Sequence, residues 1–155
     1  MEKRGLTVVF LRRILVTTDL SQHSLEAMEY ASSFGLLYTS TIFLLHVAEA
    51  GRSAEEGAEA LDRFAKEHLD PERKLTHVVR CGNAAEEIVR FARDSGIDLI
   101  VMATHGRTGL QHMVMGSVAE RVVRLADTPV LTVKPKPVRE SILRKEDVEA
   151  ELHLR

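Results

Sequence analysis

Short apolar runs alternate along this chain with longer stretches in which apolar residues recur every three or four positions. Four of the runs are nearly continuous in apolar residues, a pattern typical of strands that are covered on both faces of a parallel sheet. The remaining run, Lys74–Arg80, is mixed and favours an edge strand. The runs that we predict as strands are Arg13–Thr18, Thr41–Val47, Lys74–Arg80, Leu99–Met102 and Pro129–Val133.

The stretches between the runs predict amphipathic helices. Asp19, Ser21 or Ser24 can cap the start of the first helix. Asn83 is suited to begin the third helix, and Gly96 to end it. Regular strand–helix alternation predicts right-handed βαβ units, and therefore an α/β fold with an open five-stranded parallel sheet and helices on both faces. The predicted helices are Ser24–Leu37, Ala54–Leu69, Ala84–Ser95 and Val118–Leu125.

The ends of the chain depart from this alternation. We expect an N-terminal extension over residues 1–11, one domain over 12–134, and a C-terminal tail over 135–155 that is partly helical. Prolines at 135 and 137 interrupt regular structure, and the charged segment that follows carries a weak apolar stripe. A solvated helix and an arm that clasps a second copy of the chain are both compatible with that stripe.

Composition narrows the class of protein. A net charge of −2 gives no electrostatic reason to expect DNA or RNA as a partner. Cys81 is the single cysteine, so an internal disulfide and a cysteine-based zinc site are excluded. The apolar stretch Leu6–Leu11 is too short for a signal peptide, and no segment is long enough to span a bilayer. We therefore expect a cytoplasmic protein with no membrane or nucleic-acid partner.

One junction between a strand and a helix carries a chemical signal. The buried run Leu99–Met102 is followed by a loop with Gly106 and Gly109. A helix then begins at Gly116 and Ser117. Such a junction presents unpaired backbone N–H groups, and the helix dipole also favours an anion there. The junction therefore predicts a phosphate-binding site, and hence a nucleotide.

Several blocks of sequence resemble the universal stress protein family. The resemblance extends over about Arg12–Lys134, and the blocks occur in the expected order. It implies an adenine nucleotide alpha hydrolase-like fold with strand order 3-2-1-4-5. The blocks are Ile14–Ser21, Leu44–Val47, Asp98–Gly109, Gly116–Val122 and Pro129–Val133.

The nucleotide-binding branch of that family has a Gly-x2-Gly-x9-Gly-Ser/Thr signature. Gly106, Gly116 and Ser117 match it, but Ala103 replaces the first glycine. The added methyl group crowds the ribose if it lies under the sugar. Alanine is tolerated there if its backbone keeps an ordinary negative φ.

The resemblance also implies a role for individual residues. Asp19 would contact the ribose, and the Val47 backbone would pair with adenine. Arg107 either reaches a phosphate or is a solvated loop residue. The amides of Gly106, Gly116, Ser117 and Val118, with the serine hydroxyl, would bind phosphates, while Thr17, Thr18, Met102, Ala103 and His105 would line the pocket.

Plainer interpretations remain open for some of these residues. Asp19 can be a helix-start residue, Gly106 and Gly109 can be turn residues, and Ser117 can be an N-cap. His46 is most simply a packed or hydrogen-bonded histidine. His105 and His112 lie seven residues apart without nearby carboxylates, so we expect no protein metal site.

The motifs of common nucleotide enzymes are absent from the sequence. There is no lysine-containing phosphate loop, no Gly-x-Gly-x-x-Gly after the first strand and no nucleophile elbow. We therefore expect no catalytic residue. We expect the chain to bind ATP (or AMP or ADP) together with Mg²⁺, and the nucleotide to act as a regulatory ligand in stress response or signalling. The resemblance implies a homodimer through Pro129–Val133. The alternatives are a nucleotide-free dimeric scaffold and a slow ATP hydrolase that uses His105 or Arg107.

Overall fold

The structure, a computed structural model, describes residues 8–105 and 115–134. Its centre is a five-stranded parallel sheet in the order β3-β2-β1-β4-β5, which confirms the predicted fold class and strand order. The mixed run that was expected at an edge forms the edge strand β3. The strands are β1 (Arg13–Thr18), β2 (Thr41–Ala48), β3 (Leu75–Cys81), β4 (Leu99–Ala103) and β5 (Val130–Val133).

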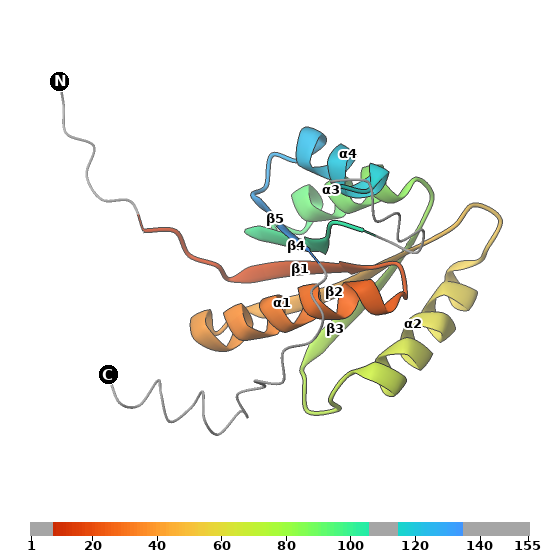
Figure 1. Cartoon of the computed structure of the whole chain (residues 1–155), viewed down its shortest axis with the longest axis horizontal. Helices are drawn as coiled ribbons and strands as arrows, with labels where there is room; N and C mark the ends of the chain where they lie inside the picture. Colours follow the sequence, from red (N-terminus) through yellow and green to blue (C-terminus); the bar gives the residue numbers. More distant parts are fainter. Residues whose placement is uncertain (1–7, 106–114, 135–155) are drawn as a thin grey trace.

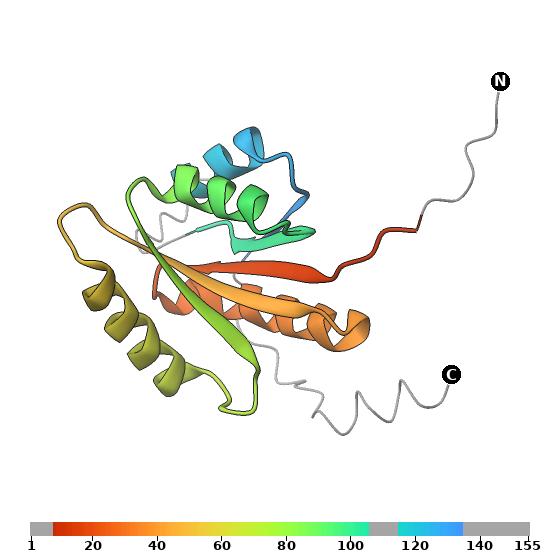
Figure 2. The same ribbon diagram turned by 180° about the vertical axis from the view of Figure 1, so that it is seen from behind.

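Helices cover both faces of this sheet (Figure 1). Helices α1 and α2 lie on one face, and α3 and α4 lie on the other, as the view from behind also shows (Figure 2). A single turn of 3-10 helix, η1 (Gln22–Ser24), precedes α1 and was not predicted. The helices are α1 (Leu25–Tyr38), α2 (Ala54–His68), α3 (Ala84–Asp94) and α4 (Ser117–Leu125).

Each face of the sheet has its own apolar core. Along β1, Ile14 and Val16 pack with α1 and α2, whereas Leu15 packs with α3 and α4. All three side chains are fully buried, which explains why the run is continuous rather than alternating. The run that forms β5 was also expected to be covered on both faces. In the structure β5 is an edge strand, and Val130–Thr132 is only half-buried. A strand at the edge has a neighbour on one side only, so its side chains are covered less completely.

Local sequence signals set both ends of α3 and the start of α2. Asn83 caps α3 through the Glu86 amide as predicted, and Gly96 (φ +58°) follows the last turn in the left-handed conformation that favours glycine. At α2, Ser53 and Glu56 form a reciprocal capping box. A backbone hydrogen bond and the Ser53 hydroxyl lower the pKa of Glu55 below its usual 4.5.

The side-chain caps predicted at Ser21 and Ser24 for the start of α1 are wrong. The Ser21 and Ser24 side chains accept no capping hydrogen bond from the first turns of η1 and α1. The Ser24 hydroxyl instead donates to the Ser21 carbonyl (2.7 Å) and pairs with the Thr18 hydroxyl (2.8 Å). The described residues form no helix whose length and apolar character would let it span a lipid bilayer.

Candidate functional site

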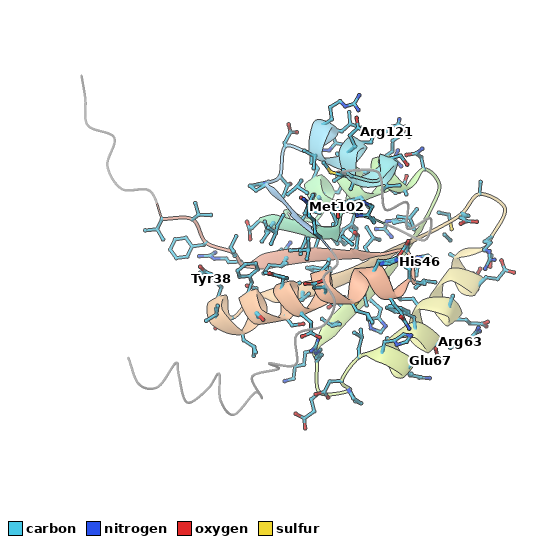
Figure 3. All side chains as sticks on the ribbon, viewed as in Figure 1. Tyr38, His46, Arg63, Glu67, Met102 and Arg121 are labelled. Atoms are coloured by element: carbon cyan, nitrogen blue, oxygen red, sulfur yellow. The ribbon has the colours of Figure 1, made fainter. Side chains whose placement is uncertain are left out.

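A cavity of about 440 Å³ opens where the carboxyl ends of β1, β2 and β4 meet the first turns of α3 and α4. The chain leaves β1 toward β2 and β3, and returns through β4 to the other side of β1. The cavity therefore lies at the topological switch point, where ligands bind in open α/β sheets. Figure 3 shows the labelled His46 far from Tyr38, which is the last residue of α1 and lies toward the other end of the strands.

The β1 wall of the cavity is held by side-chain hydrogen bonds. One carboxylate oxygen of Asp19, Oδ1, accepts from the Ser21 amide (3.1 Å) and from the Ser21 hydroxyl (2.6 Å). The Leu20 amide donates to the Thr18 hydroxyl (2.9 Å). Leu20 itself has φ +65°, a conformation uncommon for a residue with a side chain. Asp19 thus satisfies an amide before η1, as the helix-start interpretation expects, and it also lines the cavity.

The β2 wall carries His46 and Val47. Nδ1 of His46 lies 3.1 Å from the Thr18 carbonyl oxygen, and because a carbonyl only accepts, this nitrogen carries a proton. The imidazole is buried, so the interpretation as a packed, hydrogen-bonded histidine is confirmed, although the ring also lines the cavity. Val47 follows near the strand end and is half-buried.

Helix α2 approaches this wall closely at Gly57. A Cβ atom at Gly57 would lie 2.8 Å from Cγ1 of Val79 and 3.2 Å from Cβ of Ala48. The absence of a side chain therefore brings α2 against β2 and β3. Gly57 also lines the cavity.

The wall between β4 and α4 is built from the main chain. The Thr104 amide donates to the Val133 carbonyl (2.9 Å), and the Thr104 carbonyl accepts from the Gly116 amide (2.6 Å). The Gly116 amide, which we expected to bind phosphate, therefore donates its hydrogen bond to the protein itself. Gly116 is the N-cap of α4 and Ser117 is the first helical residue, so the interpretation of Ser117 as an N-cap is wrong.

The first turn of α4 consequently has no side-chain cap among the described residues. The amides of Ser117 and Val118 have no partner inside a helix, because the first four N–H groups of a helix never do. Both residues line the cavity, and the positive end of the helix dipole lies there. This end of the cavity is suited to an anion.

Ala103 stands at the end of β4 and lines the cavity. The described non-glycine residues with positive φ are Leu20 and Thr39, so Ala103 keeps an ordinary backbone conformation. The replacement of the signature glycine therefore introduces no backbone strain.

The predicted site residues within the described part of the chain all line this one cavity. Gly106 and Arg107 lie outside the described residues, as do Gly109 and His112. His105 pairs with the Thr104 hydroxyl through Nδ1 (2.9 Å). The predicted residues that line the cavity are Thr17, Thr18, Asp19, Val47, Met102, Ala103, His105, Gly116, Ser117 and Val118.

Sequence reasoning missed the part of the lining that comes from other elements. Glu49 and Arg52 lie in the connection after β2, and Gly57 and Ala60 lie on α2. No motif marks these positions, because the packing of α2 against the sheet brings them to the cavity. The described residues contain no group of three histidine, cysteine, aspartate or glutamate side chains that could hold a metal ion.

A sequence comparison identifies the family. The model of the universal stress protein family matches residues 11–134. The chain belongs to the universal stress protein family.

Two relatives from Methanocaldococcus jannaschii are similar to this universal stress protein over most of their length. Universal stress protein MJ0531 is 37% identical over 83% of this chain and 85% of its own. Universal stress protein MJ0577 is 30% identical over 83% of this chain and 98% of its own. The solved structure of MJ0577 superposes with a TM-score of 0.71 at 31% identity, over 84% of this chain and all of that one.

Two more distant solved structures contain nucleotides. A universal stress protein in complex with cAMP has a TM-score of 0.61 at 23% identity, and covers 81% of this chain and 98% of its own. The universal stress protein from Archaeoglobus fulgidus in complex with dAMP has a TM-score of 0.55 at 19% identity, with the same coverage. At these identities the likeness shows a shared fold.

Proposed function

We propose that this universal stress protein binds an adenine nucleotide, which is ATP, ADP or AMP, in the cavity at the carboxyl edge of the sheet. The proposal rests on one observation. The Asp19 carboxylate, the end of β2 at Val47 and the uncapped start of α4 surround a single cavity.

These groups differ in the chemistry that they offer. A carboxylate accepts hydrogen bonds from sugar hydroxyls, a strand end offers main-chain groups to the edge of a base, and helix amides attract phosphate. The cavity volume of about 440 Å³ lies within the range of roughly 300–1,000 Å³ that is usual for small-molecule sites. Apolar residues such as Ile88 and Met102 complete a lining suited to a base.

The nucleotides bound by relatives support the same ligand class. One relative holds cAMP and another holds dAMP, which share the adenine and a phosphate. Mg²⁺ would be bound mainly by the phosphate oxygens and water, since the described residues contain no group that could form a metal site by themselves. The ion would neutralise phosphate charge.

We infer that the nucleotide acts as a regulatory ligand. A ligand that binds one conformation more tightly stabilises that conformation by its differential affinity. Among the described residues that line this cavity we identify hydrogen-bonding and positioning groups, but no activated nucleophile. A slow hydrolase would need His105 or Arg107 near the terminal phosphate.

Calorimetry with ATP, ADP and AMP, each with and without Mg²⁺, tests the proposal. Mass spectrometry of the natively purified protein shows whether a nucleotide is carried over. We expect binding that Asp19→Ala weakens and that Asp62→Ala, an exposed site outside the cavity, leaves unchanged.

Two other outcomes would replace the proposal. Absence of carried-over nucleotide and of binding heat with every nucleotide would favour the nucleotide-free scaffold. ADP formation that is lost in His105→Ala or Arg107→Ala would favour the hydrolase.

We further propose a homodimer that pairs through β5. This strand lies at the edge of the sheet, and Val130–Thr132 is half-buried, so main-chain groups and apolar surface are available to a second copy. Thr132→Lys should shift the sedimentation coefficient to that of a monomer. Thr76→Lys on the opposite edge strand is the matched control. A dimer that survives Thr132→Lys with unchanged stability would contradict pairing through β5.

A further inference from the structure

We propose that the segment 138–155, which follows β5 in sequence, forms an amphipathic helix that packs within the same chain against an apolar strip beside α1. The universal stress protein model ends at residue 134, and this segment lies outside the described residues. The proposal therefore gives a role to a part of the chain that the family model does not cover. The apolar strip consists of Tyr30, Phe34, Leu37 and Tyr38 on α1, with Leu131 on β5.

The apolar strip on α1 adjoins the side of that helix that is buried against the sheet. With about 3.6 residues per turn, the four strip residues of α1 fall on one flank of this buried side. Phe34 packs against the core, and its ring centroid lies 6.5 Å from that of Tyr38. Tyr30, Leu37 and Tyr38 are exposed, so the described part of the chain leaves large apolar side chains uncovered here. The residues of the buried side are Ala27, Met28, Ala31 and Gly35.

The apolar strip faces the β5 edge of the sheet. The other flank of α1 faces β3, because the Arg73 guanidinium, in the connection that leads into β3, donates to Glu29 (2.9 Å) and to Ser32 (3.4 Å). Helix α2 also lies beside α1 on the side of β3 (Figures 1 and 2). Toward β5, Leu131 packs against the same core as Phe34 and is only half-buried.

The topology of the fold directs a segment after β5 to the face of α1. The connections that run across the sheet from β1 toward β3 contain α1 and α2 and lie on one face, whereas those that run toward β5 contain α3 and α4 and lie on the other. This division follows from the right-handed crossover between parallel strands. A segment that turns back from β5 across the sheet runs in the same direction as the connection through α1. With the same hand, it lies beside α1 at the apolar strip.

The sequence of the segment fits this place. On a helix, Ile142, Val148 and Leu152 fall within about a third of the circumference, which gives the segment one apolar side. A helix over 138–155 would be about 27 Å long, enough to cover the 14-residue α1, which is about 21 Å long. The few residues between β5 and 138 match the roughly 2–6 residues that are usual between a strand and a helix.

Charge favours a segment that runs parallel to α1. The charged residues of α1 are Glu26 and Glu29, both near its start, and the start of α1 and the end of β5 lie at the same edge of the sheet. The part of the segment and its connection nearest to β5 is mainly basic, and the part that follows is acidic. The basic part would therefore run beside the acidic start of α1. The basic residues are Lys134, Lys136, Arg139, Arg144 and Lys145, and the acidic residues that follow are Glu146, Asp147, Glu149 and Glu151.

Hydrogen exchange of the full chain, followed by mass spectrometry, tests the proposal. We expect the amides of 142–152 to exchange at least about tenfold more slowly than those of a free peptide of the same sequence. Leu152→Ser removes an apolar contact with the strip and should reduce this protection about tenfold. Leu154→Ser is the matched control, because Leu154 falls on the other side of the helix, and it should keep the protection.

A second matched pair lies on α1. Leu36 and Leu37 are neighbours with nearly equal exposure, 48% and 51%, but Leu37 belongs to the apolar strip and Leu36 lies on the flank that faces β3. Leu37→Ser should reduce the protection of the segment about tenfold, and Leu36→Ser should leave it unchanged. Leu37→Ser combined with Leu152→Ser should cause little further loss, because both variants remove the same contact. Urea titration of each variant controls for a change in global stability.

Three results would overturn the proposal. Exchange at the rate of the free peptide in the native chain would show a solvated segment. Protection that falls on dilution, or a carboxylate-to-amine crosslink from the segment to α1 that joins ¹⁵N-labelled and unlabelled chains, would show an arm that clasps a second copy. Protection that Leu37→Ser leaves unchanged, or that Leu36→Ser reduces equally, would show that the segment does not pack on the strip. No strip residue lines the described cavity, so these results leave the proposed function unaffected.

Discussion

The β1 wall and the β4–α4 wall line the same cavity, yet they are built from different groups. On the β1 wall, hydroxyls and a carboxylate bond one another, as in the Thr18–Ser24 pair and the Ser21–Asp19 pair. On the β4–α4 wall, the ordering contacts are between main-chain atoms, with the Thr104 carbonyl joined to the Gly116 amide.

The difference separates two kinds of recognition. A side-chain network is specific, because each hydroxyl or carboxylate has one geometry in which its partners are satisfied. Main-chain amides at a helix start are general, because they attract any anion of suitable size. On the proposed function, the sugar is read by the β1 wall and the phosphates are held by the β4–α4 wall.

The largest effect should come from Thr18→Val in the β1 wall. Valine has the same shape, but it leaves the buried Ser24 hydroxyl and the Leu20 amide without the oxygen of Thr18. We expect the free energy of unfolding to fall by about 1–3 kcal/mol in urea titrations. Thr76→Val, on an exposed position of β3, is the control and should change it by less than about 0.5 kcal/mol. Equal stability of the two variants would mean that the network does not hold this wall.

Ala103→Gly tests the β4–α4 wall, at the position where the signature of the family has its first glycine. Glycine in a strand has more conformational freedom in the unfolded chain, so stability should fall by about 0.5–1 kcal/mol. Because Ala103 has no positive φ, we expect the Kd for ATP to change less than about twofold, which is about 0.4 kcal/mol. Calorimetry that gives a clearly tighter Kd would show instead that the methyl group crowds the sugar.

Gly116→Ser should change stability and binding in opposite directions. Gly116 has φ −70° and ψ 156°, the conformation of a serine N-cap, so a serine hydroxyl can accept from the first turn of α4. We expect a gain of a few tenths of a kcal/mol in thermal unfolding. The same hydrogen bond removes an amide from the phosphate site, so the Kd for ATP should rise. Tighter binding in this variant would contradict a phosphate site at the start of α4.

Ser117→Ala should have the smallest effect on stability. Ser117 is exposed and is the first helical residue rather than the N-cap, so the free energy of unfolding should change by less than about 0.3 kcal/mol. If its hydroxyl assists the α4 amides in binding phosphate, the Kd for ATP should rise about threefold, which corresponds to one exposed hydrogen bond. A large loss of stability would show that the side chain has a structural role.

Much of the architecture could be predicted from local sequence. The buried strand β1 is a continuous apolar run because helices cover it on both faces, and β3 is mixed because it lies at an edge. Asn83 caps α3 through an amide close to it in sequence, and Gly96 ends α3 through its own backbone angle φ. Residue type and position were therefore enough to predict both roles. The caps proposed for α1 failed because the hydroxyl of Ser24 found a partner on β1 instead.

Residue order alone therefore determined the succession of strands and helices, and it marked Asp19, Val47 and the start of α4 as positions at the carboxyl edge of the sheet. Only the tertiary structure decided that Gly57 brings α2 to the cavity, that the Gly116 amide is used by Thr104, and that Ser21 holds Asp19. The physical reason is the separation along the chain over which each kind of signal acts. Apolar periodicity and helix signals act between residues that are close along the chain, whereas hydrogen-bond partners and close packing depend on which atoms folding brings within a few ångströms.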